Sequence, residues 1–237
     1  MLKYFVLLFI SFILGTYFTK KVIKLAVKYD AVDTPTHRKV HRNIIPLWGG
    51  IAIYLSFFLT IAVYFLFGSD FRNSLFMNNY LLGKKLLGLL VGGSILIVMG
   101  IIDDKWGLPP KVKLLGQIIA VLIVLMFGVR ILGFTIPFFN KYISFPYVIS
   151  AVFTFIWIII IINSINFIDG LDGLAGGIAF ISCISFFIIA YHKPPVHSFL
   201  FASKVSYMVC VISIILAGSI AAFLRFNFNP AKVFMGD

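Results

Sequence analysis

The residues of this sequence best suited to chemistry are its aspartates. Only eight of the 237 residues are acidic, and all eight are Asp. Six of them fall in four short segments, which contain Asp33, Asp103 with Asp104, Asp169 with Asp172, and Asp237. Carboxylates bind hard divalent cations and accept protons. Because the chain has so few acids and groups most of them, we expect them to take part in chemistry.

Asp103 and Asp104 end a long apolar stretch in GIIDDKWGLPPKVKLLGQ. Neighbouring residues of a helix point about 100° apart, so the two carboxylates cannot both face one ligand squarely. Their repulsion calls for a cation or a raised pKa, and Mg²⁺ takes one or two carboxylates together with phosphate oxygens and water. One Asp would then face the metal and the other a substrate proton. The structural alternative is that the pair stops the helix and binds Lys105, Lys111 or Lys113.

The segment NSINFIDGLDGLAGG carries polar residues at every third position, namely Asn163, Asn166, Asp169 and Asp172. Neighbouring members of this series share a face of a helix, and the glycine after each Asp is expected to break that helix. Asn donates and accepts hydrogen bonds, which suits a nucleobase or a sugar, whereas Asp only accepts them. Helix capping is the alternative, and it accounts for one Asp rather than for the whole series.

Two further segments combine charge with tight turns. DTPTHRKVHRNIIPLWGG carries cationic or titratable partners for phosphates, namely Arg38, Lys39, His41 and Arg42. Ordinary contact with anionic lipids is the alternative for these residues. NFNPAKVFMGD ends in a glycine and Asp237, and the glycine permits a close backbone approach to a ligand. The alternative for this segment is a disordered end of the chain.

The elements that must position these residues are predicted to lie in a membrane. Hydrophobic residues make up 61% of the chain and charged residues 12%, and the mean hydropathy is +1.07. Soluble domains contain about 25% charged residues, so this composition excludes a soluble fold. The net charge of +12 is attributed to membrane topology and phosphate binding, and not to nucleic acid.

Seven apolar stretches have bilayer-spanning length: residues 4–19, 47–67, 86–102, 114–129, 147–162, 174–191 and 205–224. Because lipid satisfies no backbone polar group, we expect helices, and therefore an all-α polytopic integral membrane protein. Alternate loops then share one side, which holds residues 20–46, 103–113, 163–173 and 225–237. These loops contain seven of the eight Asp and 12 of the 20 Lys and Arg residues. The basic excess predicts that this side of the plasma (inner) membrane is cytoplasmic, and that the aspartates form one composite site there.

Four motifs together resemble the polyprenyl-phosphate N-acetylhexosamine-1-phosphate transferases: DTPTHRKVH…PLWGG, GIIDDKWGLPPKVKLLGQ, NSINFIDGLDGLAGG and NFNPAKVFMGD. The resemblance implies an integral membrane enzyme that uses Mg²⁺ or Mn²⁺. Such an enzyme moves a sugar-1-phosphate from a UDP-sugar to polyprenyl phosphate and releases UMP, in the synthesis of cell-envelope polysaccharides such as lipopolysaccharide or teichoic acid. The RKVH stretch and the short DDKWGLPPK loop resemble the branch that acts on UDP-N-acetylglucosamine. The branch that acts on UDP-MurNAc-pentapeptide usually reads TPTMGG where this chain reads IPLWGG.

Carried over to this sequence, the resemblance assigns roles to single residues. Asp103 would contact or deprotonate the lipid phosphate, and Asp104 and Asp237 would bind the metal. Nucleotide-sugar contacts are expected from Asn163, Asn166, Asp169 and Asp172, with one Asp as the nucleophile in an alternative two-step route. Phosphates would be held by Arg38, Lys39, His41 and Arg42, and further substrate contacts are expected from Lys111 and Asn227.

In the family the motif continues beyond MGD into further spans and a cytoplasmic loop containing His. Residues 1–237 are therefore expected to be a single membrane domain, an incomplete N-terminal portion of the family fold, and a homodimer is compatible with the sequence. Two other functions stay open: a UDP-MurNAc-pentapeptide phosphotransferase of the same family, and an ion-coupled transporter. A transporter would place ionisable residues near mid-span, whereas every Asp here is predicted at or beyond a span end.

Overall fold

A computed structural model describes residues 1–35, 44–76, 81–136, 139, 141–192 and 199–236. Within these residues the helices are α1 (Leu2–Lys28), α2 (Gly49–Phe67), α3 (Ser69–Phe76), α4 (Leu81–Trp106), α5 (Pro110–Met126), α6 (Tyr147–Ile168), α7 (Leu174–His192) and α8 (Phe199–Asn227). Two antiparallel strand pairs accompany them, β1 (Val32–Asp33) with β2 (Ile45–Pro46) and β3 (Gly133–Ile136) with β4 (Lys141–Ser144).

All seven apolar stretches of the sequence are helical, and the prediction of an all-α polytopic membrane protein is confirmed. Six of the described helices are long and apolar enough to cross a membrane. The seventh, α5, has 17 residues, about 25 Å of helix, which is the lower limit for a span. It begins four residues before the predicted stretch because Pro110 occupies the first turn, where a missing N–H costs nothing.

Besides residues 20–46, which contain the end of α1 and the β1–β2 pair, two connections expected to be loops contain regular structure. Residues 68–85 include α3, and residues 130–146 form the β3–β4 pair, in which Gly133 lies opposite Ser144 and Ile136 opposite Lys141. These elements are too short to be recognised by the bilayer-length apolar stretches that identify the spans. Both satisfy backbone N–H and C=O groups where the chain turns back into the bundle.

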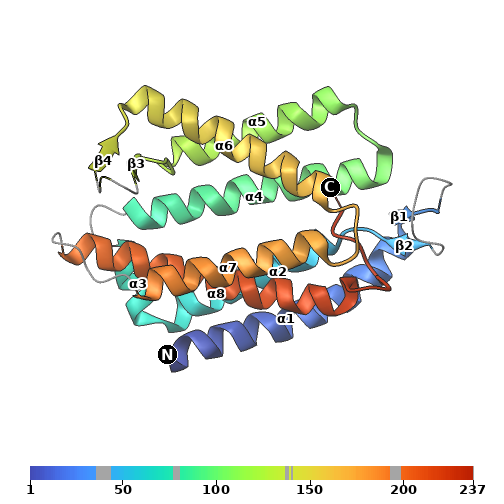
Figure 1. The fold of residues 1–237 in the computed structure, drawn as a ribbon. Coiled ribbons are helices and arrows are strands. Elements are labelled where there is room, and N and C mark those ends of the chain that lie inside the picture. The colour runs from blue at the N-terminus through green and yellow to red at the C-terminus, as the bar shows by residue number, and fades with distance from the viewer. Residues whose placement is uncertain (36–43, 77–80, 137–138, 140, 193–198, 237) are drawn as a thin grey trace.

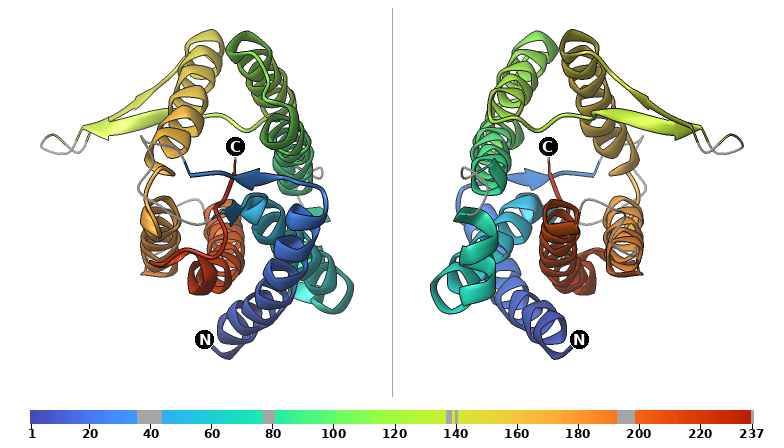
Figure 2. Two further views of the ribbon diagram at one scale, coloured as in Figure 1. Left: turned by 90° about the vertical axis from the view of Figure 1, so that its right-hand side faces the viewer. Right: turned by 90° about the vertical axis from the view of Figure 1, so that its left-hand side faces the viewer.

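The helices pack in two groups (Figure 2). One consists of α1, α2, α7 and α8, in which α8 contacts the other three, and the second consists of α4, α5 and α6 in chain order. Buried residues make up 72% of the α8 span and only 11% of the α6 span. The helix α8 is therefore central, and α6 lies at the periphery.

The four aspartate-bearing segments meet at one end of the bundle. Figure 1 shows the β1–β2 pair, the α4–α5 turn, the α6–α7 connection and the C-terminal segment at this end, which we call the aspartate end. The N-terminus, α3 and the β3–β4 pair lie at the opposite end, which we call the far end. The prediction that alternate loops share one side is thus confirmed.

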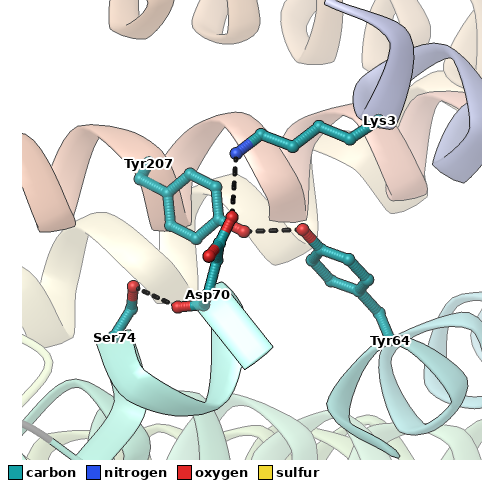
Figure 3. A network of polar contacts seen from close by, with 5 residues as sticks. All are labelled: Lys3, Tyr64, Asp70, Ser74 and Tyr207. Carbon is teal, nitrogen blue, oxygen red and sulfur yellow. Dashed lines mark hydrogen bonds and ion pairs between the residues drawn. The ribbon is translucent and has the colours of Figure 1, made fainter. Parts of the chain in front are cut away.

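Polar contacts at the far end join four helices (Figure 3). Lys3 Nζ of α1 lies 3.7 Å from Asp70 Oδ2 of α3 and 4.5 Å from the ring centre of Tyr207 in α8. The hydroxyls of Tyr207 and Tyr64 in α2 are 2.6 Å apart, and the Ser74 hydroxyl donates to the Asp70 carbonyl. The ion pair is exposed, and such pairs contribute about 0–1 kcal/mol. Asp70 therefore serves as a surface charge remote from the other aspartates.

Close packing of α1 on α8 depends on Gly218. A Cβ at this position would overlap the Ser11 Oγ and the Leu8 carbonyl oxygen of α1, whereas a Cβ at Gly177 of α7 would have no neighbour within 4 Å. We expect Gly218→Ala to lower the free energy of unfolding by about 1–3 kcal/mol through overpacking. Gly177→Ala, the matched control, should leave it unchanged or raise it. Thermal unfolding of both variants in one detergent measures this, and a Gly218→Ala protein as stable as the parent would contradict the packing.

Candidate active site

Asp103 and Asp104 are directed toward different neighbours, as their adjacency on a helix predicts. The Leu108 N–H donates to Asp103 Oδ1 at 2.6 Å, and Lys113 Nζ lies 3.2 Å from Asp103 Oδ2. Only 9% of the Asp103 side chain is exposed. Asp103 therefore fastens the turn between α4 and α5 and pairs with Lys113, which is the structural alternative considered for this residue.

Asp104 faces the end of the chain. Gly236 has a φ of +81°, and a Cβ there would overlap Asp104 Oδ2 and lie 3.0 Å from its Cγ. A glycine is required at this position because both the positive φ and the close approach exclude a side chain. The second and fourth aspartate segments thus touch at Asp104 and Gly236. Asp237 itself lies outside the described residues.

The C-terminal segment is fixed to the start of α2. The N–H groups of Gly49 and Gly50 donate to the carbonyls of Phe234 and Met235 at 2.9 and 2.8 Å, and the Phe234 N–H donates to the Pro46 carbonyl at 2.9 Å. A Cβ at Gly49 would lie 2.6 Å from the Phe234 oxygen. The two glycines of PLWGG therefore bind the backbone of VFMG. The sequence did not reveal this role.

Asp172 and Asn227 join the α6–α7 connection to the C-terminal segment. Asp172 Oδ2 accepts hydrogen bonds from Asn229 Nδ2 and the Ala231 N–H, both at 3.0 Å. Asn227 is 2% exposed; its Oδ1 accepts from the Gly173 N–H at 3.0 Å and its Nδ2 donates to the Val233 carbonyl at 2.9 Å. Asn227 was expected to contact substrate, but the structure buries it and gives it a positioning role.

The series of polar residues on α6 is divided between two environments. Asn163 Nδ2 donates to Gln117 Oε1 of α5 at 2.9 Å, so this residue joins two helices. Gln117 was not singled out in the sequence, although it is the one polar residue in the apolar stretch 114–129. Asn166 and Asp169 are half-buried at the aspartate end. The helix stops at Ile168 and α7 starts at Leu174, which confirms the predicted break.

The predicted phosphate-binding residues are located only in part. Lys111 is exposed in the first turn of α5, at the aspartate end. Val32 pairs with Pro46 and Asp33 with Ile45, so the two flanks of the first motif segment lie side by side at the same end. The four predicted residues of this segment, Arg38, Lys39, His41 and Arg42, lie outside the described residues.

The oxygen donors here suit a hard divalent cation such as Mg²⁺ or Mn²⁺. Among the described residues, no group of three or more His, Cys, Asp or Glu side chains is close enough to hold a metal ion. Magnesium rarely occupies such an all-protein cage, since it binds one or two carboxylates together with phosphate oxygens and water. The Asp104 carboxylate against the backbone of Gly236 fits that partial set.

Comparison with known proteins identifies the family. The family model described as glycosyl transferase family 4 matches residues 86–237. A Bacillus subtilis (strain 168) protein named "Probable undecaprenyl-phosphate N-acetylglucosaminyl 1-phosphate transferase" is 32% identical over 237 residues, which cover 100% of this chain and 59% of the relative. This chain belongs to glycosyl transferase family 4. The resemblance seen in its four motifs is thereby confirmed.

Two further relatives of this family-4 chain differ in their named substrates. The decaprenyl-phosphate N-acetylglucosaminephosphotransferase of Mycolicibacterium smegmatis is 32% identical over 94% of the chain and 53% of its own length. The phospho-N-acetylmuramoyl-pentapeptide-transferase of Campylobacter lari is 31% identical over 97% of the chain and 67% of its own length. The chain thus spans between about half and two thirds of the length of these three relatives.

Loss of the Asn227 side chain should loosen the aspartate end. Asn227→Ala leaves the Gly173 N–H and the Val233 carbonyl without their buried partners, at about 1–3 kcal/mol for each group. We expect amide hydrogen exchange in residues 169–173 and 228–236 to accelerate by roughly tenfold or more.

Asn229→Ala is the matched control, since Asn229 is exposed and the Ala231 N–H still reaches Asp172. It should change exchange only slightly. Equal exchange in the parent and in Asn227→Ala would show that Asn227 does not hold the two segments together.

Proposed function

We propose that the protein transfers a sugar-1-phosphate, specifically N-acetylglucosamine-1-phosphate, from a UDP-sugar to polyprenyl (undecaprenyl) phosphate and releases UMP. The observation that carries this proposal is the meeting of all four motif segments at one end of the bundle, in a chain that aligns over its whole length with a relative named for this reaction. The names of the relatives from Bacillus and Mycolicibacterium favour N-acetylglucosamine as the sugar. So does the sequence PLWGG, which differs from the TPTMGG usual in the branch that acts on UDP-MurNAc-pentapeptide. The Campylobacter lari relative keeps UDP-MurNAc-pentapeptide as the second candidate.

The positions of the aspartates favour an enzyme that acts at the membrane surface over an ion-coupled transporter. Asp103 and Asp104 belong to the last turn of α4, while Asp169 and Asp172 lie between α6 and α7. A transporter normally places its ionisable residues near the middle of its spans. Two substrates that each carry phosphate and meet at a membrane surface suit carboxylates in this position.

In the proposed reaction, an oxygen of the lipid phosphate attacks the β-phosphorus of the UDP-sugar. A new P–O bond forms at the β-phosphorus. The bond from the β-phosphorus to the oxygen that bridges it to the α-phosphorus breaks, and UMP leaves with that oxygen and the bonding electron pair. Asp104 and Asp237 would hold Mg²⁺, which when bound neutralises charge on the phosphates. Arg38, Lys39, His41 and Arg42 would bind and orient phosphate oxygens.

A covalent intermediate on Asp172 or Asp103 is disfavoured, and direct attack by the lipid phosphate is the simpler route. Two nitrogen donors hold one oxygen of Asp172, and an N–H and Lys113 hold the Asp103 carboxylate. Hydrogen bonds and a paired cation stabilise a carboxylate and weaken it as a nucleophile. The lipid phosphate is already an anionic oxygen nucleophile, so positioning and charge neutralisation suffice.

The metal role of Asp104 is tested by Asp104→Asn. We expect metal-dependent UMP release from UDP-N-acetylglucosamine, in membranes supplied with polyprenyl phosphate, to fall at least ~100-fold. Asp70→Asn makes the same charge change at the far end and should leave the rate unchanged at equal protein level. Full activity in Asp104→Asn would contradict the metal-site proposal. Turnover of UDP-MurNAc-pentapeptide in place of UDP-N-acetylglucosamine by the parent protein would support the second candidate function.

We further propose that the aspartate end faces the cytoplasm across the plasma membrane, as its excess of Lys and Arg favours. Topology reporters fused after residues 42, 108 and 168 should all be found inside the cell. A single reporter outside would break the proposal of one cytoplasmic site.

A further inference from the structure

The second half of α1 presents lysines away from the bundle. Its buried residues in this half are Thr19, Val22 and Ala26, and its exposed lysines are Lys20, Lys21, Lys24 and Lys28. At about 100° per residue the lysines cover an arc of roughly 100°, centred on the side opposite the buried residues. The buried side packs on α2 and α8, and α1 lies at the edge of the bundle in Figure 2.

This face changes from apolar to cationic along the helix. Ile13 and Tyr17 lie on the same side as the lysines and are 51% and 50% exposed, and the Tyr17 ring centre lies 4.6 Å from Lys21 Nζ. The 27 residues of α1 span about 40 Å, whereas the hydrocarbon core is ~30 Å thick. Tyrosine gathers at the headgroup level of membranes. The part of α1 that follows Tyr17 is therefore expected to leave the hydrocarbon core, so that its lysines reach the level of the headgroups.

The end of α4 contributes a fifth lysine. Lys105 Nζ lies 5.6 Å from the ring centre of Tyr29 and 4.7 Å from that of Trp106, and Lys28 Nζ lies 5.8 Å from the Tyr29 ring. Tyr29 is 49% exposed and Trp106 is 66% exposed. The two helix ends thus form one cationic and aromatic surface. Across the part of the chain that the structure describes, none of the five lysines forms a salt bridge.

We propose that Lys20, Lys21, Lys24, Lys28 and Lys105, together called the lysine face, bind the headgroups of anionic phospholipids in the leaflet at the aspartate end. Charge complementarity selects the phosphate, and the apolar continuation of the same face along α1 accepts the acyl chains. Each lysine at an anionic membrane surface contributes about fivefold in affinity. A soluble polyanion would meet the cationic half alone. This binding concerns α1 and the end of α4, and it holds whichever sugar the protein transfers.

The test compares two double variants that remove the same charge. Lys20→Gln with Lys24→Gln alters the lysine face, and Lys84→Gln with Lys141→Gln alters exposed residues at the far end. The detergent-solubilised protein is titrated with phosphatidylglycerol or phosphatidylcholine, and native mass spectrometry counts the bound lipids. We expect the parent to prefer phosphatidylglycerol. The first variant should raise the Kd for the first phosphatidylglycerol roughly tenfold or more, and the far-end variant should leave it within about twofold.

Three results would overturn the proposal: no preference for phosphatidylglycerol in the parent, an unchanged Kd in the lysine-face variant, or an equal loss in the far-end variant. A fourth result would also contradict it: displacement of phosphatidylglycerol by heparin, at equal concentrations of phosphate and sulfate groups, would show that the lysine face binds soluble polyanions. Lys20→Arg with Lys24→Arg should keep the affinity of the parent, because the charge is kept. Failure of the transfer reaction would leave all of these outcomes unaffected.

Discussion

A helix that starts at a membrane surface begins with backbone N–H groups that have no partner within the helix. The start of α2 has no side-chain cap, and Trp48 before it adopts a left-handed φ of 72°. The carbonyls of Phe234 and Met235 supply the missing acceptors, and the positive end of the helix dipole favours them. Once this contact is made, Gly236 is fixed beside Asp104, and the rest of the aspartate end is arranged around it.

Many of the polar residues at this end are used to hold the chain. Asp172 and Asn227 bind the C-terminal segment, Asp103 binds the α4–α5 turn, and Asn163 joins α6 to α5. Three connections that lie far apart in the sequence are thus fixed relative to one another. Such fixation is what phosphoryl transfer asks of a protein, since its catalysis consists mainly of positioning and electrostatics.

The sequence revealed the spans, the sharing of one end by the Asp segments, and the divergence of Asp103 from Asp104, because each follows from helix period and chain parity. It did not reveal the partners of Asn227 or Asn163. A polar side chain near a helix end looks the same in sequence whether it meets a substrate or another part of the chain, and only the packing of α8 and α5 decides. The β3–β4 pair was missed because its strands have four residues each, too few for a periodic signal.

The contact between α2 and the C-terminal segment also orders events during synthesis. Ribosomes add about 5–20 residues per second, so α2 enters the membrane roughly ten seconds or more before Phe234 and Met235 exist. During that interval the first N–H groups of α2 must donate to water or to another acceptor. The contact at the start of α2 therefore forms only after α8 has been synthesised, and every nascent chain passes through a stage in which α2 is inserted but the aspartate end has not yet closed.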